Sequence, residues 1–344
     1  MDHIQFALST GQSAGTFFHD IRFVHQALPN LGVEDIRIHT ETGDLKLKSP
    51  VFINAMTGGG GRQTEKLNAL LAYAAKETGI AMAVGSQMAA LRDPEERASY
   101  QIVRKVNPEG FIIGNLGSEA SLKQAEEAIE MIEANALQIH LNVIQELTMP
   151  EGDRDFKGAL ERIEEIAEKV KVPVIVKETG FGISREAAEK LASTKIAAID
   201  VSGYGGTNFA AIENERRARK LSYFQEWGVP TAAAIIEVKK AFPQTVLASG
   251  GIQNALDMVK AFALGANAAG LAGSFLKTAI EHGEKQLITD IETLKEDLGM
   301  MMTALGAKDI ADLEDCPLII SGELYHYLLL RGYDPAAFAN RKKN

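Results

Sequence analysis

Polar and apolar side chains alternate along the segment LQIHLNV, and this alternation is the strongest chemical signal in the sequence. Gln138, His140 and Asn142 recur with a period of two, so they share one face of an expected β-strand. Gln145 and Glu146 follow directly after this strand. Buried polar groups are costly without partners, and this face ends in a carboxylate. We therefore interpret it as part of a catalytic or binding site.

A single carboxylate such as Glu146 suits Mg²⁺, which keeps several waters and often takes its other ligands from substrate phosphates. His140 has an alternative interpretation, because a histidine on a strand is often a hydrogen-bonded core residue. Its polar neighbours favour the functional interpretation. The sequence has no histidine or cysteine cluster with zinc spacing, and no GxSxG or HExxH motif, so it supports neither an α/β-hydrolase nor a zinc protease.

Glycine-rich segments indicate a second site, for a phosphate group. SGG at 249–251 and AGS at 272–274 each end an apolar run and precede an expected helix. Small residues let backbone N–H groups approach a phosphate, and the N-terminus of the following helix adds positive potential. The donor-rich segment 202–207 (SGYGGT) suits the same ligand. The alternative is that these glycines only form tight turns between strands and helices.

Lys177 lies near the end of the apolar run VPVIVKE, a setting in which a lysine rarely lacks a partner. One interpretation is a salt bridge to Glu178 or to another nearby carboxylate. The interpretation that we favour is a cation held against an anionic atom of a cofactor.

The scaffold for these residues is an eightfold repeat of short apolar run, loop and helix. The expected strands are residues 51–56, 80–85, 111–116, 137–143, 172–178, 196–203, 245–251 and 267–273. The expected helices follow at 63–78, 94–106, 119–134, 156–170, 184–193, 229–242, 254–264 and 274–283. Continuous apolar runs are typical of parallel strands buried on both faces. Eight such units predict an α/β fold of the (β/α)8 TIM-barrel type.

We expect a single domain over residues 1–344, because no linker rich in proline, serine or charge divides the chain. Residues 1–49 form an expected N-terminal extension, 50–284 the barrel, and 285–344 additional C-terminal helices. The active site of such a barrel lies at the C-terminal ends of its strands, where the polar and glycine-rich residues gather.

Composition narrows the class of protein and its partners. The chain has 46% hydrophobic residues, 24% charged residues and a formal net charge of −10, which argues against nucleic acid or an anionic membrane as a partner. No apolar stretch has the length of a transmembrane helix, and the N-terminus lacks the pattern of a signal peptide. Cys316 is the only cysteine, which excludes an intrachain disulfide, and we expect a soluble cytoplasmic protein.

Together these motifs resemble those of the type 2 isopentenyl-diphosphate isomerases, a family of FMN-dependent (β/α)8 barrels. The resemblance runs from DHIQFAL at 2–8 to about Leu313. Its most specific segments are INAMTGG (53–59), GSQ with AAL (85–91), HLNVIQELTMPEG (140–152), VKETGFG (176–182), DVSGYGGTNFAAIENER (200–216) and SGGI (249–252). The segment VIQELTMPEG is diagnostic, because related flavin barrels such as lactate oxidases and glutamate synthases lack it.

The resemblance implies roles for residues at matching positions. Lys177 would lie against the flavin ring, near N1 and O2. Glu146 would hold Mg²⁺ on the substrate diphosphate. The residues implied to line the substrate pocket and to take part in catalysis are Gln145, His140 and Asn142. The remaining implied flavin contacts are Ala55, Met56, Thr57, Ser86, Asn115, Ser202, Thr207, Gly250, Gly251, Ile252, Ala272 and Gly273.

The family's reaction interconverts isopentenyl diphosphate and dimethylallyl diphosphate in isoprenoid biosynthesis. A proton is added at one carbon and removed at another, with no net redox change. In the family, reduced FMN serves as acid and base, NADPH reduces the FMN, and Mg²⁺ neutralises the diphosphate. The resemblance also implies a homo-oligomer, between a dimer and an octamer, that acts on a small diphosphate substrate.

Three departures from the family pattern remove positive charge. The Arg-Lys pair that usually precedes the histidine matching His3 is absent, through truncation or real loss, and Met88 and Gln253 stand where arginine is common. In the family the pair binds diphosphate, commonly in a site completed by a neighbouring subunit. Arg92 and Arg216 are other candidates for these contacts.

Two alternatives to an active isomerase stay open. One is a catalytically impaired flavoprotein, which the missing cations motivate. The other is an FMN-dependent 2-hydroxy-acid oxidoreductase of the same barrel superfamily. That enzyme would need a histidine and an arginine over the flavin, and the sequence does not reveal such a pair.

Overall fold

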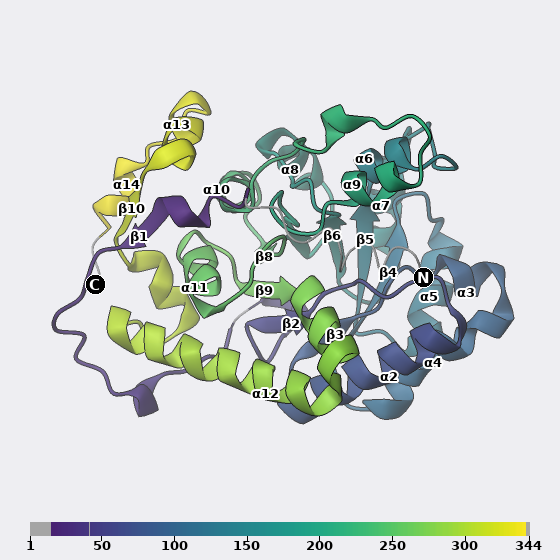
Figure 1. Cartoon of the computed structure of the whole chain (residues 1–344), viewed down its shortest axis with the longest axis horizontal. Coiled ribbons are helices and arrows are strands. Elements are labelled where there is room, and N and C mark those ends of the chain that lie inside the picture. Colours follow the sequence, from purple (N-terminus) through teal and green to yellow (C-terminus); the bar gives the residue numbers. More distant parts are fainter. Residues whose placement is uncertain (1–14, 41, 342–344) are drawn as a thin grey trace.

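The apolar runs of the chain form parallel strands that close into a barrel (Figure 1). The computed structural model describes residues 15–40 and 42–341. The barrel strands are β2 (Val51–Ile53), β3 (Ala81–Ala83), β4 (Ile112–Gly117), β5 (Ala136–Leu141), β6 (Val174–Glu178), β7 (Ala198–Asp200), β8 (Thr245–Ala248) and β9 (Ala268–Leu271). Each strand pairs with the next, and β9 pairs with β2. The predicted (β/α)8 barrel is confirmed.

Helices surround the barrel. The α-helices are α2 (Gly61–Thr78), α3 (Met88–Arg92), α4 (Ala98–Val106), α5 (Leu122–Ile132), α6 (Val143–Thr148), α7 (Ala159–Lys169), α8 (Arg185–Leu191), α9 (Phe209–Glu215), α10 (Thr231–Ala241), α11 (Ala255–Ala263), α12 (Gly273–Leu305), α13 (Gly322–Leu330) and α14 (Ala336–Ala339). The 3₁₀ helices are η1 (Phe18–Asp20), η2 (Val33–Asp35), η3 (Gly43–Leu45), η4 (Pro94–Arg97), η5 (Ser222–Phe224) and η6 (Ile310–Asp315). Among the described residues, we find no helix with the length and apolar character that crossing a membrane requires.

Apolar side chains, many of them alanine, fill the interior of the barrel. The buried apolar residues that share this cluster on the barrel strands are Phe52, Ala81, Ala83, Ile113, Ala136, Ile175, Ala198, Leu247 and Ala268. Leu45 and Leu47, which precede β2, belong to the same cluster and are 0% and 2% exposed. Interiors pack at high density, so the space beside the alanines is filled by side chains from outside the barrel.

A polar layer follows the apolar layer toward the C-terminal ends of the strands. Side chains alternate along a strand, so the second residue after an inward-facing residue also points inward. Lys177 lies two residues after Ile175 in this way. The other members of the polar layer are Asn54, Asn115, Gln138, His140, Asp200 and Ser249. The strand register sets His140 beside Lys177 and Lys177 beside Asp200.

The strand prediction over residues 137–143 is wrong at its C-terminal end. β5 ends at Leu141, and the chain enters α6 with Asn142 at the N-cap position. The N–H of Glu146 donates to the Asn142 oxygen at 2.9 Å, so a helix begins where a long loop was expected. The Asn142 side chain does not cap the backbone here; it donates to Glu146 Oε1 at 2.8 Å, four residues along, which is a contact that favours a helix. Asn142 is therefore not part of the strand face on which the sequence analysis placed it.

One further helical segment differs from the expectation. The segment after β7, expected as a long loop, contains α9, whose N-cap Asn208 accepts the N–H of Ala211 at 3.0 Å. The last barrel helix ends near Gly283, as expected, and the first of the expected C-terminal helices continues from it to Leu305. Gly283 has the non-helical angles φ 80° and ψ −174°, which break α12 at this point.

The N-terminal and C-terminal segments of the described chain pair with each other, which the sequence did not reveal. β1 (Ile21–Phe23) and β10 (Leu318–Ile320) form a two-stranded antiparallel sheet beside the barrel (Figure 1). Asp20 extends this link, because its Oδ2 accepts the N–H of Leu324 at 2.9 Å. Lys260 on α11 donates to the Phe18 oxygen at 2.8 Å. The position of the missing Arg-Lys pair, ahead of His3, lies outside the described residues.

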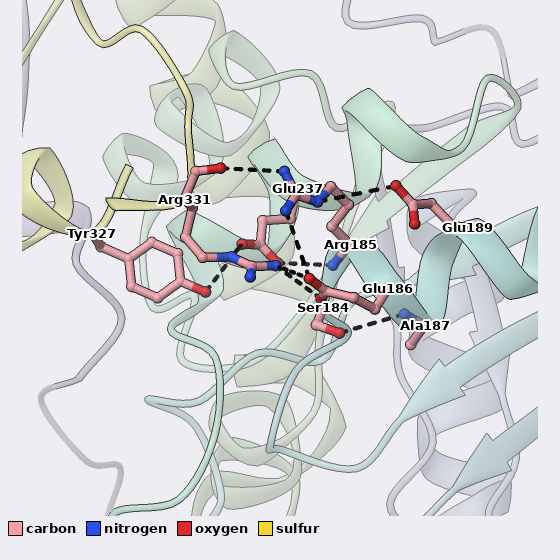
Figure 2. Close-up of polar contacts among 8 residues, drawn as sticks. All are labelled: Ser184, Arg185, Glu186, Ala187, Glu189, Glu237, Tyr327 and Arg331. Atoms are coloured by element: carbon pink, nitrogen blue, oxygen red, sulfur yellow. Dashed lines mark hydrogen bonds and ion pairs between the residues drawn. The ribbon is translucent and has the colours of Figure 1, made fainter. Parts of the chain in front are cut away.

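A buried carboxylate connects the C-terminal segment to α8 and α10 (Figure 2). Glu237 on α10 is 0% exposed and accepts hydrogen bonds from Arg331 Nε at 2.6 Å, Tyr327 Oη at 3.1 Å and Arg185 N at 2.8 Å. Arg331 also donates to both carboxylate oxygens of Glu186, at 2.7 and 2.8 Å. These partners satisfy a charge that would be costly to bury alone.

Replacing Arg331 by methionine would leave Glu237 buried with neutral donors only. We expect Arg331→Met to lower the free energy of unfolding by about 2–4 kcal/mol, measured by urea denaturation. Lys169→Met is the control, because it removes an exposed ion pair with Glu165 that contributes little. Equal shifts of the two urea midpoints would contradict this view of Glu237.

Candidate functional site

A pocket lies at the C-terminal ends of the barrel strands. Most of the residues that the resemblance assigns to the flavin line this pocket. They are Ala55, Met56, Lys177, Ser202, Thr207, Gly250, Gly251, Ile252, Ala272 and Gly273. The lining residues without an assignment from the sequence are Asn54, Thr179, Gly180, Phe209, Ser249, Gly270 and Leu271. Asn54 and Ser249 could have been found by extending the period of two past the ends of β2 and β8.

The other three flavin candidates, Thr57, Ser86 and Asn115, are not among the residues that line this pocket. Thr57 Oγ1 donates to Asn68 Oδ1 at 2.5 Å. The Ser86 oxygen accepts the hydroxyl of Tyr100 at 2.6 Å, and burial raises the pKa of Tyr100 to about 12, so the hydroxyl stays a donor. Asn115 belongs to the polar layer. Their proposed contacts with a flavin remain predictions.

The glycines after β7 and β8 bring two loops together backbone to backbone. Gly250 and Gly251 have φ angles of +98° and +73°, which favour glycine. A Cβ on Gly250 would lie 2.2 Å from the Gly203 oxygen, and one on Gly251 would lie 2.3 Å from the Gly205 oxygen. Nearby in the lining, Gly273 begins α12, whose first N–H groups have no partner within the helix. Such a set of N–H donors fits a phosphate.

Lys177 supplies a buried ammonium group to the pocket wall. The residue is 7% exposed, and its Nζ donates to the Glu178 backbone oxygen at 2.6 Å and to Ser202 Oγ at 3.4 Å. Burial lowers the pKa of Lys177, while the negative charges of Asp200 and then Glu178 act in the opposite direction. The lysine therefore bonds the main chain of Glu178, in contrast to the salt bridge considered from the sequence, and the charge of Asp200 favours its ammonium form.

Glu178 holds the loop that follows β6. Its Oε2 accepts the N–H groups of Thr179 at 2.6 Å and Phe181 at 2.5 Å. Burial raises the pKa of Glu178 to about 8, while the Phe181 N–H and the charge of Lys177 act in the opposite direction. The carboxylate thus fixes a loop that contributes two residues, Thr179 and Gly180, to the pocket.

Ser202 lines the pocket in a strained backbone conformation. Its φ angle is +36°, and a left-handed conformation costs a non-glycine residue about 1–3 kcal/mol. The Ser202 oxygen accepts the N–H groups of Gly180 at 3.1 Å and Gly182 at 3.0 Å, and its own N–H donates to Asp200 Oδ1 at 3.2 Å. Strain of this kind persists only where the surroundings hold it, and these three hydrogen bonds do so.

His140 is held as a neutral imidazole. Its Nδ1 lies 3.1 Å from Asn115 Oδ1, so we assign the proton to Nδ1, which leaves Nε2 as an acceptor. Burial and then the positive charge of Lys177 lower the pKa of His140 to about 4, against a hydrogen bond with the Leu116 backbone that raises it. A neutral ring beside a buried cation can bind a substrate group without adding a second positive charge.

Glu146 lies on α6, half-buried, with both carboxylate oxygens hydrogen-bonded. Oε1 accepts Asn142 Nδ2 at 2.8 Å, and Oε2 accepts the N–H of Asp153 at 2.7 Å. These bonds orient the carboxylate and leave lone pairs free on each oxygen. Gln145, also half-buried, precedes it on the same helix.

A metal at Glu146 would need ligands beyond this protein's acidic and imidazole groups. Within residues 15–40 and 42–341, no cluster of three or more His, Cys, Asp or Glu side chains could hold a metal ion. Glu119 is a neighbouring carboxylate whose pKa is raised by burial and then by the charges of Glu146 and Asp153. The donor chemistry fits Mg²⁺, which accepts one carboxylate and completes its shell with water and substrate phosphate oxygens.

The segments that carry α6 and α9 dock on each other. Arg216, at the end of α9, pairs with Glu151 and with the buried Glu213, the latter at 2.7 Å. Arg217 donates to the Thr148 oxygen at 3.0 Å. Arg216 is thus engaged in ion pairs that hold the two segments together. The other cation considered for the diphosphate, Arg92, is exposed at the end of α3.

Sequence comparison with known proteins places this chain in a family. The model of the FMN-dependent dehydrogenase family matches residues 84–319. An isopentenyl-diphosphate delta-isomerase of Bacillus pumilus (strain SAFR-032) is 60% identical over 345 residues, covering 99% of this chain and 97% of its own. The protein of the same name from Geobacillus sp. (strain WCH70) is 54% identical over 342 residues, covering 99% of this chain and 98% of its own.

Solved structures share the fold at low sequence identity. A flavocytochrome b2 variant with sulfite bound superposes with a TM-score of 0.68 at 18% identity, covering 93% of this chain and 83% of its own. The lactate oxidase of Pediococcus acidilactici gives a TM-score of 0.66 at 18% identity, covering 92% and 87%. At this identity the likeness concerns the fold alone, which is the barrel described above.

Gly250 offers a test of the backbone contact between the two loops. We expect Gly250→Ala to weaken FMN binding by about 100-fold, because the loops must separate and at least two hydrogen bonds to the ligand are lost. The measurement is a flavin fluorescence titration of the protein freed of its cofactor. Gly79→Ala is the control: Gly79 also has a positive φ, +68°, but a Cβ there meets no atom within 4 Å. Equal FMN affinity in the parent and Gly250→Ala would contradict the phosphate assignment.

The pH dependence of His140 follows from its lowered pKa. We expect the imidazole signals in NMR spectra to titrate near pH 4 and to stay constant between pH 5 and 8. The folded pKa lies below the ordinary value of 6.5, so this group's contribution to stability is present above pH 6.5 and is lost as the pH falls toward 4. Lys177→Met should raise the pKa, since it removes a nearby positive charge. A ring that titrates near pH 6.5 in the parent would contradict this environment.

Proposed function

This chain belongs to the FMN-dependent type 2 isopentenyl-diphosphate delta-isomerases, and from this premise we propose that it interconverts isopentenyl diphosphate and dimethylallyl diphosphate. The observation that carries the proposal is the pocket at the C-terminal ends of β6 to β9. It gathers the buried Lys177, the glycine pair 250–251 and the start of α12 around one space. The segment with His140, Gln145 and Glu146 follows on the strand next to β6.

The residues present fit FMN. The N–H groups at Gly250, Gly251 and Gly273 suit its phosphate, and the Lys177 ammonium suits negative charge on the reduced ring. When bound, reduced FMN supplies the group that exchanges protons with the alkene of the substrate. Lys177 would stabilise the reduced form by its charge. The neutral His140 would line the alkene site without repelling positive charge that develops there.

Glu146 is proposed to hold Mg²⁺ on the diphosphate, with its orientation set by Asn142 and the Asp153 N–H. The metal would offset the negative charge of the diphosphate and orient the substrate in the site. Asn142 would then act mainly through the carboxylate, and Gln145 would contact the substrate directly. NADPH as the source of electrons for FMN, and isoprenoid biosynthesis as the setting, belong to the same proposal.

An oxidoreductase acting on 2-hydroxy acids is the competing function, and the pocket argues against it. Such an enzyme needs a histidine and an arginine beside the flavin to receive a proton and to bind a carboxylate. Among the described residues, none that lines the pocket is an arginine able to bind a carboxylate, and His140, beside Lys177 on the neighbouring strand, is a neutral ring outside this lining. Lys177, the one cation among the described lining residues, lies on the flavin-binding wall by our assignment.

The experiment that tests the function is an anaerobic assay with isopentenyl diphosphate, FMN, NADPH and Mg²⁺. Formation of dimethylallyl diphosphate, without net consumption of NADPH per turnover, is the expected result. FMN binding without any isomerisation would instead favour the impaired flavoprotein. NADPH-independent oxidation of lactate or mandelate would favour the oxidoreductase.

Glu146→Gln tests the metal assignment. A neutral amide is a far weaker ligand for a hard cation, so we expect isomerase activity to fall by at least about 100-fold while FMN stays bound. Glu151→Gln is the matched control, since it removes one negative charge from the same segment, where Glu151 pairs with Arg216. The control should keep the Mg²⁺ dependence of the parent. An unchanged Mg²⁺ titration in Glu146→Gln would exclude this carboxylate as the ligand.

Self-association is proposed as well, in line with the homo-oligomer that the resemblance implies. Apolar side chains are exposed on β10 and α13, where Ile319 is 47%, Leu329 is 48% and Leu330 is 89% exposed. Exposed apolar residues that gather in one region favour contact with another protein surface. Light scattering coupled to size-exclusion chromatography measures the mass directly, and a monomer at micromolar concentration would contradict the proposal.

A further inference from the structure

Asp200 is a buried carboxylate to which neither the sequence nor the family comparison gave a role. It is the last residue of β7 and is 0% exposed, and its two carboxylate oxygens accept three hydrogen bonds. Its Oδ2 accepts Asn54 Nδ2 at 2.7 Å, and its Oδ1 accepts Ser249 Oγ at 2.6 Å and the Ser202 N–H at 3.2 Å. Burial raises the pKa of Asp200, while the charge of Lys177 and the three hydrogen-bond donors act in the opposite direction and favour the ionised form. The short bond to Ser249 is typical of a charge-assisted contact.

The three donors to Asp200 are residues of the pocket wall. Asn54, Ser202 and Ser249 all line the pocket, and they follow three different barrel strands. Asp200 itself lies behind them, outside the lining. One carboxylate thus fixes side chains or backbone from β2, β7 and β8 at the place where the FMN is proposed to bind.

Asp200 is also connected to Lys177 through Ser202. The strand register sets Lys177 and Asp200 side by side on β6 and β7. Between them, the Ser202 N–H donates to Asp200 Oδ1, and Lys177 Nζ donates to Ser202 Oγ at 3.4 Å. Ser202 keeps its φ of +36° in this arrangement. Without the carboxylate, the strained serine would lose one of the bonds that hold it, and the lysine would lose its nearest counter-charge on β7.

We propose that Asp200 is a positioning residue for the cofactor site, which fixes Ser202 in its left-handed conformation and keeps the Lys177 ammonium charged and in place. The inference rests on the proposed binding of FMN but not on the isomerase reaction. If the parent protein does not bind FMN, the proposed function fails. If the parent binds FMN and the Asp200 variants bind it equally well, this inference fails alone.

A dependence on pH follows from the groups that face Lys177. These are Asp200 on β7, Glu178 on its own strand and the neutral His140 on β5. Burial lowers the pKa of Lys177, and Asp200 is the largest influence that raises it. Removing the charge of Asp200 therefore lets the pKa of Lys177 fall further. The ammonium should then be lost at a lower pH, and with it the affinity for the cofactor.

The test is the FMN dissociation constant of Asp200→Asn, measured by fluorescence titration from pH 6 to pH 10. We expect affinity about 10-fold weaker than the parent at pH 7, and a loss of affinity at high pH that begins at least about one pH unit earlier. Lys177→Met should remove this pH-dependent loss. The same affinity and pH profile in Asp200→Asn and the parent would overturn the proposal.

Glu237→Gln is the matched control, because it also neutralises a carboxylate that is 0% exposed, but outside the pocket (Figure 2). The control should lose stability and keep the parent's FMN affinity and pH profile. If it weakens FMN binding to the same degree as Asp200→Asn, the effect is general destabilisation and the proposal is wrong.

Ser202→Gly keeps the proposal testable if Asp200→Asn does not fold. Glycine adopts a φ of +36° without strain, so it no longer needs the bond to Asp200. We expect the double variant to fold even if Asp200→Asn alone does not. If Asp200→Asn also folds, its effect on FMN affinity should be smaller in the Ser202→Gly background. A double variant that stays unfolded, or equal effects in the two backgrounds, would overturn the link through Ser202.

Discussion

The interior of the barrel removes Lys177 and Asp200 from water, and the arrangement of the pocket follows from the cost of that desolvation. Buried charges are tolerated only with opposite charges and full hydrogen bonding nearby. Here the charges lie on neighbouring strands, and the N–H groups of the loops after β6 and β7 bond the carboxylates. The bonds that reduce the desolvation cost are therefore the bonds that fix the loops of the site.

Much of this architecture could be predicted, because both faces of each barrel strand are buried and the strands are continuous apolar runs. Lys177 and the polar face with Gln138 and His140 stood out because they interrupt such runs. Asp200 interrupts the run IAAIDVSG in the same way. The sequence alone does not reveal its role, because that role depends on Asn54 and Ser249, which only the closed barrel brings to it.

The parts that could not be predicted depend on contacts far apart in the sequence or on local competition. Strands of three residues, such as Ile21–Phe23, carry almost no periodicity, and the partner Leu318–Ile320 lies beyond the whole barrel. Leu45 and Leu47 likewise enter a core built by later residues. At the end of β5 the alternation of polar and apolar residues continues into Asn142, which predicts a longer strand. The chain instead enters α6, with Asn142 at the N-cap position.

The sheet of β1 and β10 also constrains the order in which the molecule can be completed during synthesis. β1 leaves the ribosome before any barrel strand, yet its partner is made after all of them. Closing so large a loop costs conformational entropy, which is offset only after the contacts have formed. This pairing therefore belongs to the final stage of folding. The edge of β2 likewise stays unpaired until β9 has been synthesised. A ribosome that stalls before β9 would hold an incomplete sheet with two open edges, which is a template for pairing between nascent chains.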